Sequence, residues 1–107
     1  MPTLFLSAPK GKTQVGTHRR DFYTILANGI GPDYAIYTNL IGQVYSGMKA
    51  VVFDRDRGLQ AEGVVASYTA TTKTRKHVQR YDVHVHNLTQ VPYTKPPQVN
   101  RCGVALA

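Results

Sequence analysis

Two apolar runs separated by a charged turn predict a β-hairpin at the centre of the chain. Ala50 to Phe53 is apolar throughout, and the turn Asp54-Arg55-Asp56-Arg57 closes at Gly58. The second apolar run, Gly63 to Ala66, follows soon afterwards. Short continuous apolar runs bounded by turn residues are typical of buried strands. We therefore expect a small barrel or closed sheet at the centre of the protein.

A strict alternation of apolar and polar residues predicts another strand between Tyr81 and His86. In an extended chain successive side chains point to opposite faces, so every second residue shares a face. The apolar face would carry Tyr81, Val83 and Val85, and the polar face Asp82, His84 and His86. We expect this strand to have one face in the core and one outside it.

Four further segments have the composition of extended chain. Thr3 to Ser7 predicts a first strand, and Val99 to Ala107 contains a short last strand. The proline-rich stretch from Val91 to Pro97 predicts an extended connector, because proline disfavours both helix and the strand ladder. The Thr-rich stretch from Ser67 to Lys76 predicts a strand that runs out into a mobile basic loop.

One amphipathic helix is predicted in the first third of the chain. Thr17 would be its N-cap, and Asn28-Gly29 would end it. Arg19 and Arg20 would then lie in the first turn, where the helix dipole disfavours positive charge. Either solvent or a nearby acidic group or phosphate would have to accommodate them. The apolar positions recur at i, i+3 and i+4, and they are Phe22, Ile25 and Leu26.

The segment between this helix and the central hairpin has no clear period. Gly29 to Asp33 has the composition of a loop, and Tyr34 to Tyr45 is compatible with a short helical turn or with an irregular strand. Its tyrosines and amides are residues that pockets for planar bases use, with rings that stack and amides that bind the base edge. The alternative is that the tyrosine rings pack on the core.

Length and composition favour one folded domain, residues 1–107. The hydrophobic content is 42%, and no apolar stretch is long enough to cross a bilayer. The amino-terminal segment lacks the basic start of a secretory signal, and the single cysteine, Cys102, has no internal partner. We expect a cytoplasmic protein of unknown oligomeric state.

The charge of the chain points to a polyanionic partner. Thirteen Lys and Arg residues against six Asp and Glu residues give a net charge of +7. Such a field attracts nucleic acid, DNA or RNA, although a basic surface without a specific partner is the simpler alternative. The candidate phosphate contacts are Lys10, Lys12, Arg19, Arg20, Arg55, Arg57, Lys73, Arg75, Lys76 and Arg80.

Signatures of catalysis or of a resident cofactor are weak. The carboxylates of the central turn lie beside arginines, which lower rather than raise a carboxyl pKa. The Gly11-Lys12-Thr13 stretch lacks the upstream glycine of a phosphate loop, because position 6 is Leu. We expect no enzyme and no cofactor. A divalent metal has only the His-x-His spacing in its favour, with Asp82, His84 and His86 as the weak candidates.

Four stretches, in order along the chain, resemble the EVE domains of the PUA-like superfamily, which also includes YTH and ASCH domains. They are Leu4-Phe-Leu-Ser-Ala-Pro9, Gly47-Met-Lys-Ala-Val-Val-Phe-Asp54, Gly63-Val-Val-Ala-Ser67 and Arg80-Tyr-Asp-Val-His-Val85. The chain departs from the family where Ala8 replaces a Glu and Met48 an Asp, and it has no tryptophan. The resemblance implies an α+β, mostly β fold, a small PUA-like β-barrel with one or two helices at its openings.

The resemblance also implies a function, a module that binds nucleic acid and takes up a modified, for example methylated, base in an aromatic-lined pocket. The residues matched to that pocket are Ser7, Phe53 and Asp54, and Tyr37 and Asn39 are added from their chemistry. Two other classes stay open. One is a small protein–protein interaction protein without nucleic-acid affinity, and the other is a small ASCH-like enzyme that acts on nucleic acid or nucleotides.

Overall fold

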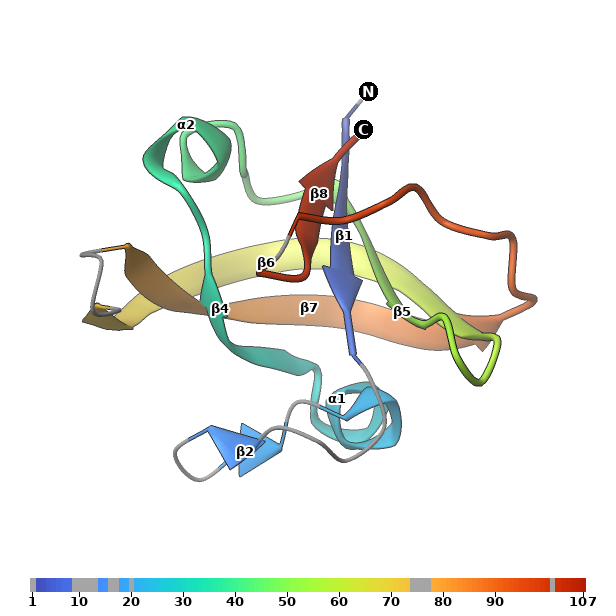
Figure 1. Ribbon diagram of the computed structural model, residues 1–107. Coiled ribbons are helices and arrows are strands. Elements are labelled where there is room, and N and C mark those ends of the chain that lie inside the picture. Colours follow the sequence, from blue (N-terminus) through green and yellow to red (C-terminus); the bar gives the residue numbers. More distant parts are fainter. Residues whose placement is uncertain (1, 9–13, 16–17, 20, 74–77, 101) are drawn as a thin grey trace.

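A strongly curled six-stranded sheet dominates the computed structural model (Figure 1). The structure describes residues 2–8, 14–15, 18–19, 21–73, 78–100 and 102–107, without the side chains of 14, 15, 18, 19, 72 and 73. Across the sheet the strand order is β4-β7-β6-β5-β1-β8. In chain order these strands are β1 Thr3–Ser7, β4 Ile30–Ala35, β5 Lys49–Asp54, β6 Leu59–Lys73, β7 Gln79–Val91 and β8 Val104–Leu106.

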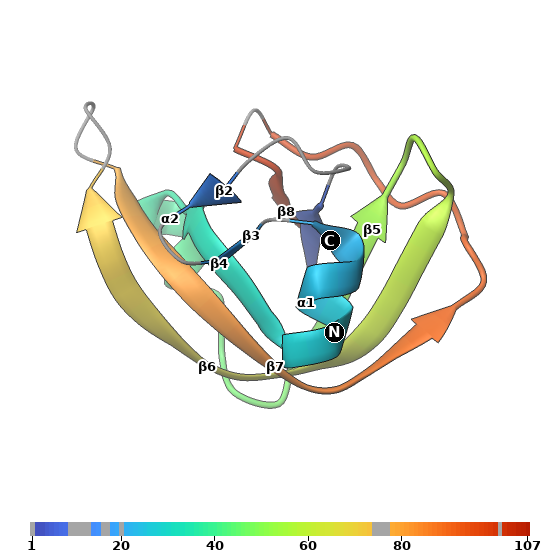
Figure 2. The same cartoon turned by 90° about the horizontal axis from the view of Figure 1, so that it is seen from below.

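Smaller elements complete the described part of the chain. A two-stranded sheet pairs β2, Gln14–Val15, with β3, His18–Arg19. The helices are α1, Phe22–Asn28, and α2, Thr38–Ile41. Viewed from below, α1 lies within the curl of the large sheet (Figure 2). None of the helices described here is both long and apolar enough to span a membrane.

The predicted central hairpin is confirmed. β5 and β6 pair antiparallel from Asp54 opposite Leu59 to Lys49 opposite Val64, and Gly58 takes a positive φ of 63° in the turn between them. β1 runs parallel to β5, so two segments more than forty residues apart lie side by side. β7 is longer than the alternating pattern predicted, and β6 joins the second apolar run to the predicted Thr-rich strand. β6 and β7 form one curved ribbon, which pairs with β5 along β6 and with β4 along β7 (Figure 2).

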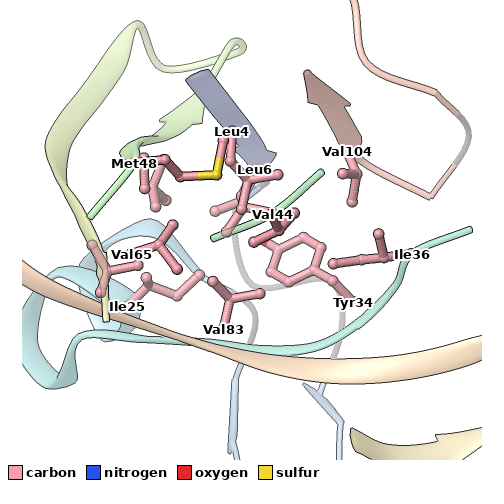
Figure 3. Packing of buried hydrophobic residues seen from close by; sticks show 14 of the residues in the cluster. Leu4, Leu6, Ile25, Tyr34, Ile36, Val44, Met48, Val65, Val83 and Val104 are labelled. Carbon is pink, nitrogen blue, oxygen red and sulfur yellow. The ribbon is translucent and has the colours of Figure 1, made fainter. Parts of the chain in front are cut away.

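The main core lies on the concave side of the curled sheet. Alternate residues of the strands point inward, and α1 adds Phe22 and Ile25, both fully buried. Figure 3 shows side chains from distant parts of the chain meeting around the Tyr34 ring. The strand residues of this cluster include Leu4, Leu6, Val52, Val65, Val83, Val85 and Val104. Burial of Val83 and Val85 confirms the predicted inner face of β7, and Tyr81 packs partly buried against the same cluster.

A second, smaller layer covers the other face of the sheet near the central hairpin. The extended connector after β7, which the prolines predicted, crosses that face. Thr94 donates hydrogen bonds to Gln60 Oε1 from its backbone N (2.9 Å) and from its hydroxyl (3.0 Å). Gln60 is itself almost fully buried, so these bonds hold the connector against β6.

Two predictions about the helix were wrong at its start. α1 begins at Phe22, and its N-cap is Asp21, whose side chain accepts a hydrogen bond from Tyr23 N at 3.2 Å. Thr17, the predicted cap, lies outside the described residues. Arg19 belongs to β3 and not to the first helical turn. The predicted end is confirmed, because Gly29 takes the left-handed conformation (φ 72°) and its N–H bonds to Ile25 O.

The predicted loop from Gly29 to Asp33 is wrong after its first residue, because β4 begins at Ile30, directly after the C-cap Gly29. β4 pairs with β7, and a register irregularity falls between Gly31 and Tyr34. Asp33 has a positive φ of 54° there, and its N–H donates to Asp82 Oδ1 at 2.8 Å. Tertiary pairing therefore overrides the turn residues of this segment.

The structure also defines the two segments whose secondary structure the sequence pattern left open, the stretch before the central hairpin and the end of the chain. The uncertain stretch from Tyr34 to Tyr45 contains the end of β4 and then the short α2. The last strand is only three residues long, because Asn100 Oδ1 accepts hydrogen bonds from Cys102 N and Val104 N and holds a turn before it.

Candidate nucleic-acid interface

Three of the five predicted pocket residues meet where β1 and β5 end. Ser7 pairs with Phe53, and Asp54 follows in the same strand. The Tyr34 hydroxyl reaches this point from β4 and donates a hydrogen bond to Ser7 O at 2.6 Å. The backbone at the end of β1 is therefore fixed from several sides.

The Phe53 side chain lies on the face of β5 away from α1. Val52 belongs to the main core cluster, whereas its neighbour Phe53 is 1% exposed and lies outside that cluster. The Arg55 guanidinium lies 5.4 Å from the centre of the Phe53 ring. Arg55 Nη2 also donates to the carbonyls of Pro96 (3.1 Å) and Pro97 (3.2 Å). Phe53 is thus packed beneath Arg55 and the connector, and does not line a space between helix and sheet.

Asp54 occupies the centre of an ion cluster that joins the hairpin turn to α1. Its carboxylate is 1% exposed and accepts hydrogen bonds from the backbone N of Asp56 (3.0 Å) and of Arg57 (3.3 Å) and from Arg57 Nε. Arg57 Nη2 donates to Asp21 Oδ1 at 3.0 Å, and its guanidinium lies 5.4 Å from the centre of the Tyr23 ring.

This cluster keeps Arg57 charged and occupied. The hydrogen bond to Asp54, supported by the one to Asp21, raises the pKa of Arg57 above its ordinary value against the opposing effect of desolvation. A guanidinium held by two carboxylates is a structural clamp between turn and helix. Arg57 is therefore no free phosphate contact, and Asp54 no free acceptor for a base.

Tyr37 and Asn39, the other two predicted pocket residues, do not lie at the ends of β1 and β5. Both are exposed at the start of α2, which sits at the opposite end of β1 from α1 (Figure 1). Among the tyrosines of that stretch, Tyr34 is fully buried and Tyr45 exposed. The structure therefore does not bring the five predicted pocket residues into one site.

The predicted phosphate contacts divide into two groups. Three arginines bond within the fold: Arg55 and Arg57 as above, and Arg80, whose Nη1 donates to Asp33 O at 2.8 Å. The other predicted contacts lie outside the described residues or have side chains that the structure does not describe: Lys10, Lys12, Arg19, Arg20, Lys73, Arg75 and Lys76.

Most carboxylates of the chain are also used inside the fold. Asp21 and Asp54 bind Arg57, Glu62 Oε1 lies 3.2 Å from Lys49 Nζ, and Asp82 accepts from Asp33 N. Asp33 in turn accepts a hydrogen bond from the Thr71 hydroxyl. Five of the six carboxylates are thus bonded to other groups of the chain.

The weak metal candidates Asp82, His84 and His86 do not form a metal-binding group in the described part of the chain. Asp82 is engaged by Asp33 N, as above, and within the described ranges no three His, Cys, Asp or Glu side chains are grouped so that they could hold a metal ion.

Sequence reasoning missed one aromatic pair. Tyr68 on β6 and Tyr81 on β7 meet edge to face, with ring centres 5.3 Å apart and planes at 90°. The period predicted an inward Tyr81, but the Thr-rich composition around Tyr68 gave no sign of its partner. Only the β6–β7 register brings the two rings together.

No family model, no curated protein and no solved structure matches this chain.

Proposed function

We propose that the protein is a nucleic-acid-binding module of the PUA-like, EVE-type class. The observation that carries the proposal is the net charge of +7, since thirteen Lys and Arg residues outnumber six carboxylates, five of which already bond to other groups of the chain. A protein with that surplus attracts a polyanion by counterion release, whatever its sequence preference.

The strands that carry the resemblance lie next to one another in the sheet. The four stretches that resemble EVE domains contribute to β1, β5, β6 and β7. These strands are consecutive neighbours in the sheet, in the order β7-β6-β5-β1. Stretches dispersed over the whole chain thus belong to one continuous curled surface, which is compatible with the proposed class.

The exposed aromatic residues favour nucleic acid over a protein partner. Among the described residues, the large hydrophobic side chains with substantial exposure are four tyrosines and one valine: Tyr23, Tyr37, Tyr45, Val64 and Tyr68. They are distributed over several elements, whereas the protein–protein alternative calls for one contiguous exposed apolar patch. Tyrosine rings suit stacking on bases.

We do not propose that the protein binds a flipped base at the ends of β1 and β5. Asp54 would have to leave Arg57, and Phe53 would have to leave the cover of Arg55 and the connector. A modified base is retained as a ligand to be tested, but the proposal rests on phosphate attraction.

Fluorescence anisotropy with labelled oligonucleotides tests the proposal. Affinity for DNA or RNA should fall steeply as salt rises between about 50 and 200 mM, because each neutralised phosphate releases counterions. Lys76→Gln should weaken binding and reduce the salt slope by about one unit. Lys95→Gln, which removes the same charge from the exposed connector, is the matched control and should change affinity less.

Matched oligonucleotides with and without a methylated base complete the experiment. A preference for the modified strand would add base reading to the proposal. Affinity that is absent at low salt, or that does not respond to salt, would refute nucleic-acid binding and favour a protein partner.

A further inference from the structure

Tyr68 lies where β6 continues beyond its partner β5. In the part of the chain that the structure describes, β6 pairs with β5 only as far as Val64, and it then continues to Lys73 beside β7 alone. Figure 2 shows the two strands extending together past the rest of the sheet. Residues from Ser67 to Thr71 are all exposed, so this end of the ribbon is open to a ligand.

The Tyr68 ring is held in place before any ligand arrives. Tyr68 is directly opposite Val83, and the rings of Tyr68 and Tyr81 share the inward face of the ribbon. Tyr81 packs against the main core and fixes one side of the Tyr68 ring by the edge-to-face contact. Tyr68 nevertheless keeps 40% of its surface exposed. Such a ring offers a large apolar surface at a small cost in conformational entropy.

The surroundings of the ring are small and free of negative charge. Ala70 is opposite Tyr81 on the same face, so it presents only a methyl group beside Tyr68. Asp82 is opposite Thr69, on the other face, where it is bonded to Asp33 N. Among the described residues of the inward face at this end of the ribbon, there is no carboxylate to repel a phosphate.

We infer that Tyr68, fixed by Tyr81, is a stacking platform for an unpaired nucleobase of single-stranded nucleic acid. This inference rests on the proposed function and adds the site and the strandedness of the ligand. Duplex bases are stacked on one another and cannot reach the ring, whereas any unpaired base has a free π-face. The positive net charge of the chain complements the phosphates on either side of the stacked base.

The test compares a short oligodeoxythymidylate with an abasic oligonucleotide of the same length and charge. Tyr68→Ala should weaken binding of the oligodeoxythymidylate by about 5- to 150-fold, the range found when stacking aromatics are replaced by alanine. It should leave binding of the abasic strand unchanged, and Tyr68→Phe should bind both strands as the wild type does.

Tyr45→Ala is the matched control, because Tyr45 is 41% exposed but lies outside the β6–β7 ribbon. Tyr68→Thr is a second removal variant that preserves the β preference of the position, and thermal melting checks that each variant folds. The platform is refuted if Tyr68→Ala and Tyr68→Thr lose no more affinity than Tyr45→Ala, or lose it equally on the abasic strand. Failure of the wild type to bind either strand at low salt would instead refute the proposed function itself.

Discussion

Replacing Gly63 by alanine should destabilise the protein, because β6 passes against a bulge in β7 at this glycine. Glu62 pairs with Thr89 and Val64 with His86, so two residues of β7, Asn87 and Leu88, face the single residue Gly63. A Cβ added there would lie 2.6 Å from His86 O, 2.8 Å from Val85 Cγ1 and 3.1 Å from Leu88 Cα.

The magnitude follows from what can move. The valine methyl can rotate, but the His86 carbonyl and Leu88 Cα are backbone atoms in the longest ladder of the sheet. Overpacking of this kind costs about 1–3 kcal/mol, which exceeds the gain of about 0.5–1 kcal/mol that alanine offers over glycine in a strand. We expect Gly63→Ala to lower the free energy of unfolding by the difference, about 0.5–2 kcal/mol, and the melting temperature by about 4–8 °C per kcal/mol.

Urea unfolding followed by far-UV circular dichroism measures this change. The matched control is Gly42→Ala, since Gly42 ends α2 with φ −64° and ψ −15°, and an added Cβ meets only Thr38 O at 3.5 Å. That variant should be neutral or more stable by about 0.4–1 kcal/mol, because alanine restricts the unfolded chain. If Gly63→Ala unfolds at the same urea concentration as the wild type, or at a higher one, the account of the bulge is wrong.

Variants at three more positions examine contacts around the ends of β1 and β5. Tyr34→Phe removes the donor to Ser7 O and should cost about 0.5–1.5 kcal/mol in urea unfolding, and an unchanged midpoint would show that this hydrogen bond is not stabilising. Asp21→Ala removes the cap of α1 and one partner of Arg57, so the melting point should fall by the equivalent of about 0.5–2 kcal/mol, whereas Asp21→Asn should retain most of the capping effect. Phe53→Ala should cost about 3–5 kcal/mol and should speed proteolysis within residues 92–100 specifically, and cleavage spread evenly over the chain would contradict the packing of the connector on this ring.

Local pattern determined the elements whose signal is contained within a few residues. The central hairpin, the first strand, the inward valines of β7 and the glycine end of α1 each follow from period or turn chemistry over less than twenty residues. The excess of basic charge is likewise a property of composition alone. These features need no knowledge of what packs against them.

Long-range pairing decided the candidate sites. A strand buried on both faces gives no period, so the sequence could not tell that Phe53 faces the connector while Asp54 faces α1. Thr17 and Asp21 are both good N-caps, and Asp21 is the residue held by Arg57 from a turn 36 positions away. Tyr68 meets Tyr81 only because the β6–β7 register brings them together, and that register shifts at several irregularities which no local pattern reveals. The sequence by itself thus determined the central hairpin, the first strand, the inner face of β7 and the charge of the protein, because each depends on neighbouring residues or on composition alone. The tertiary structure decided where β4 forms, which side chains are bonded within the fold and which remain exposed, because these depend on segments far apart in the chain.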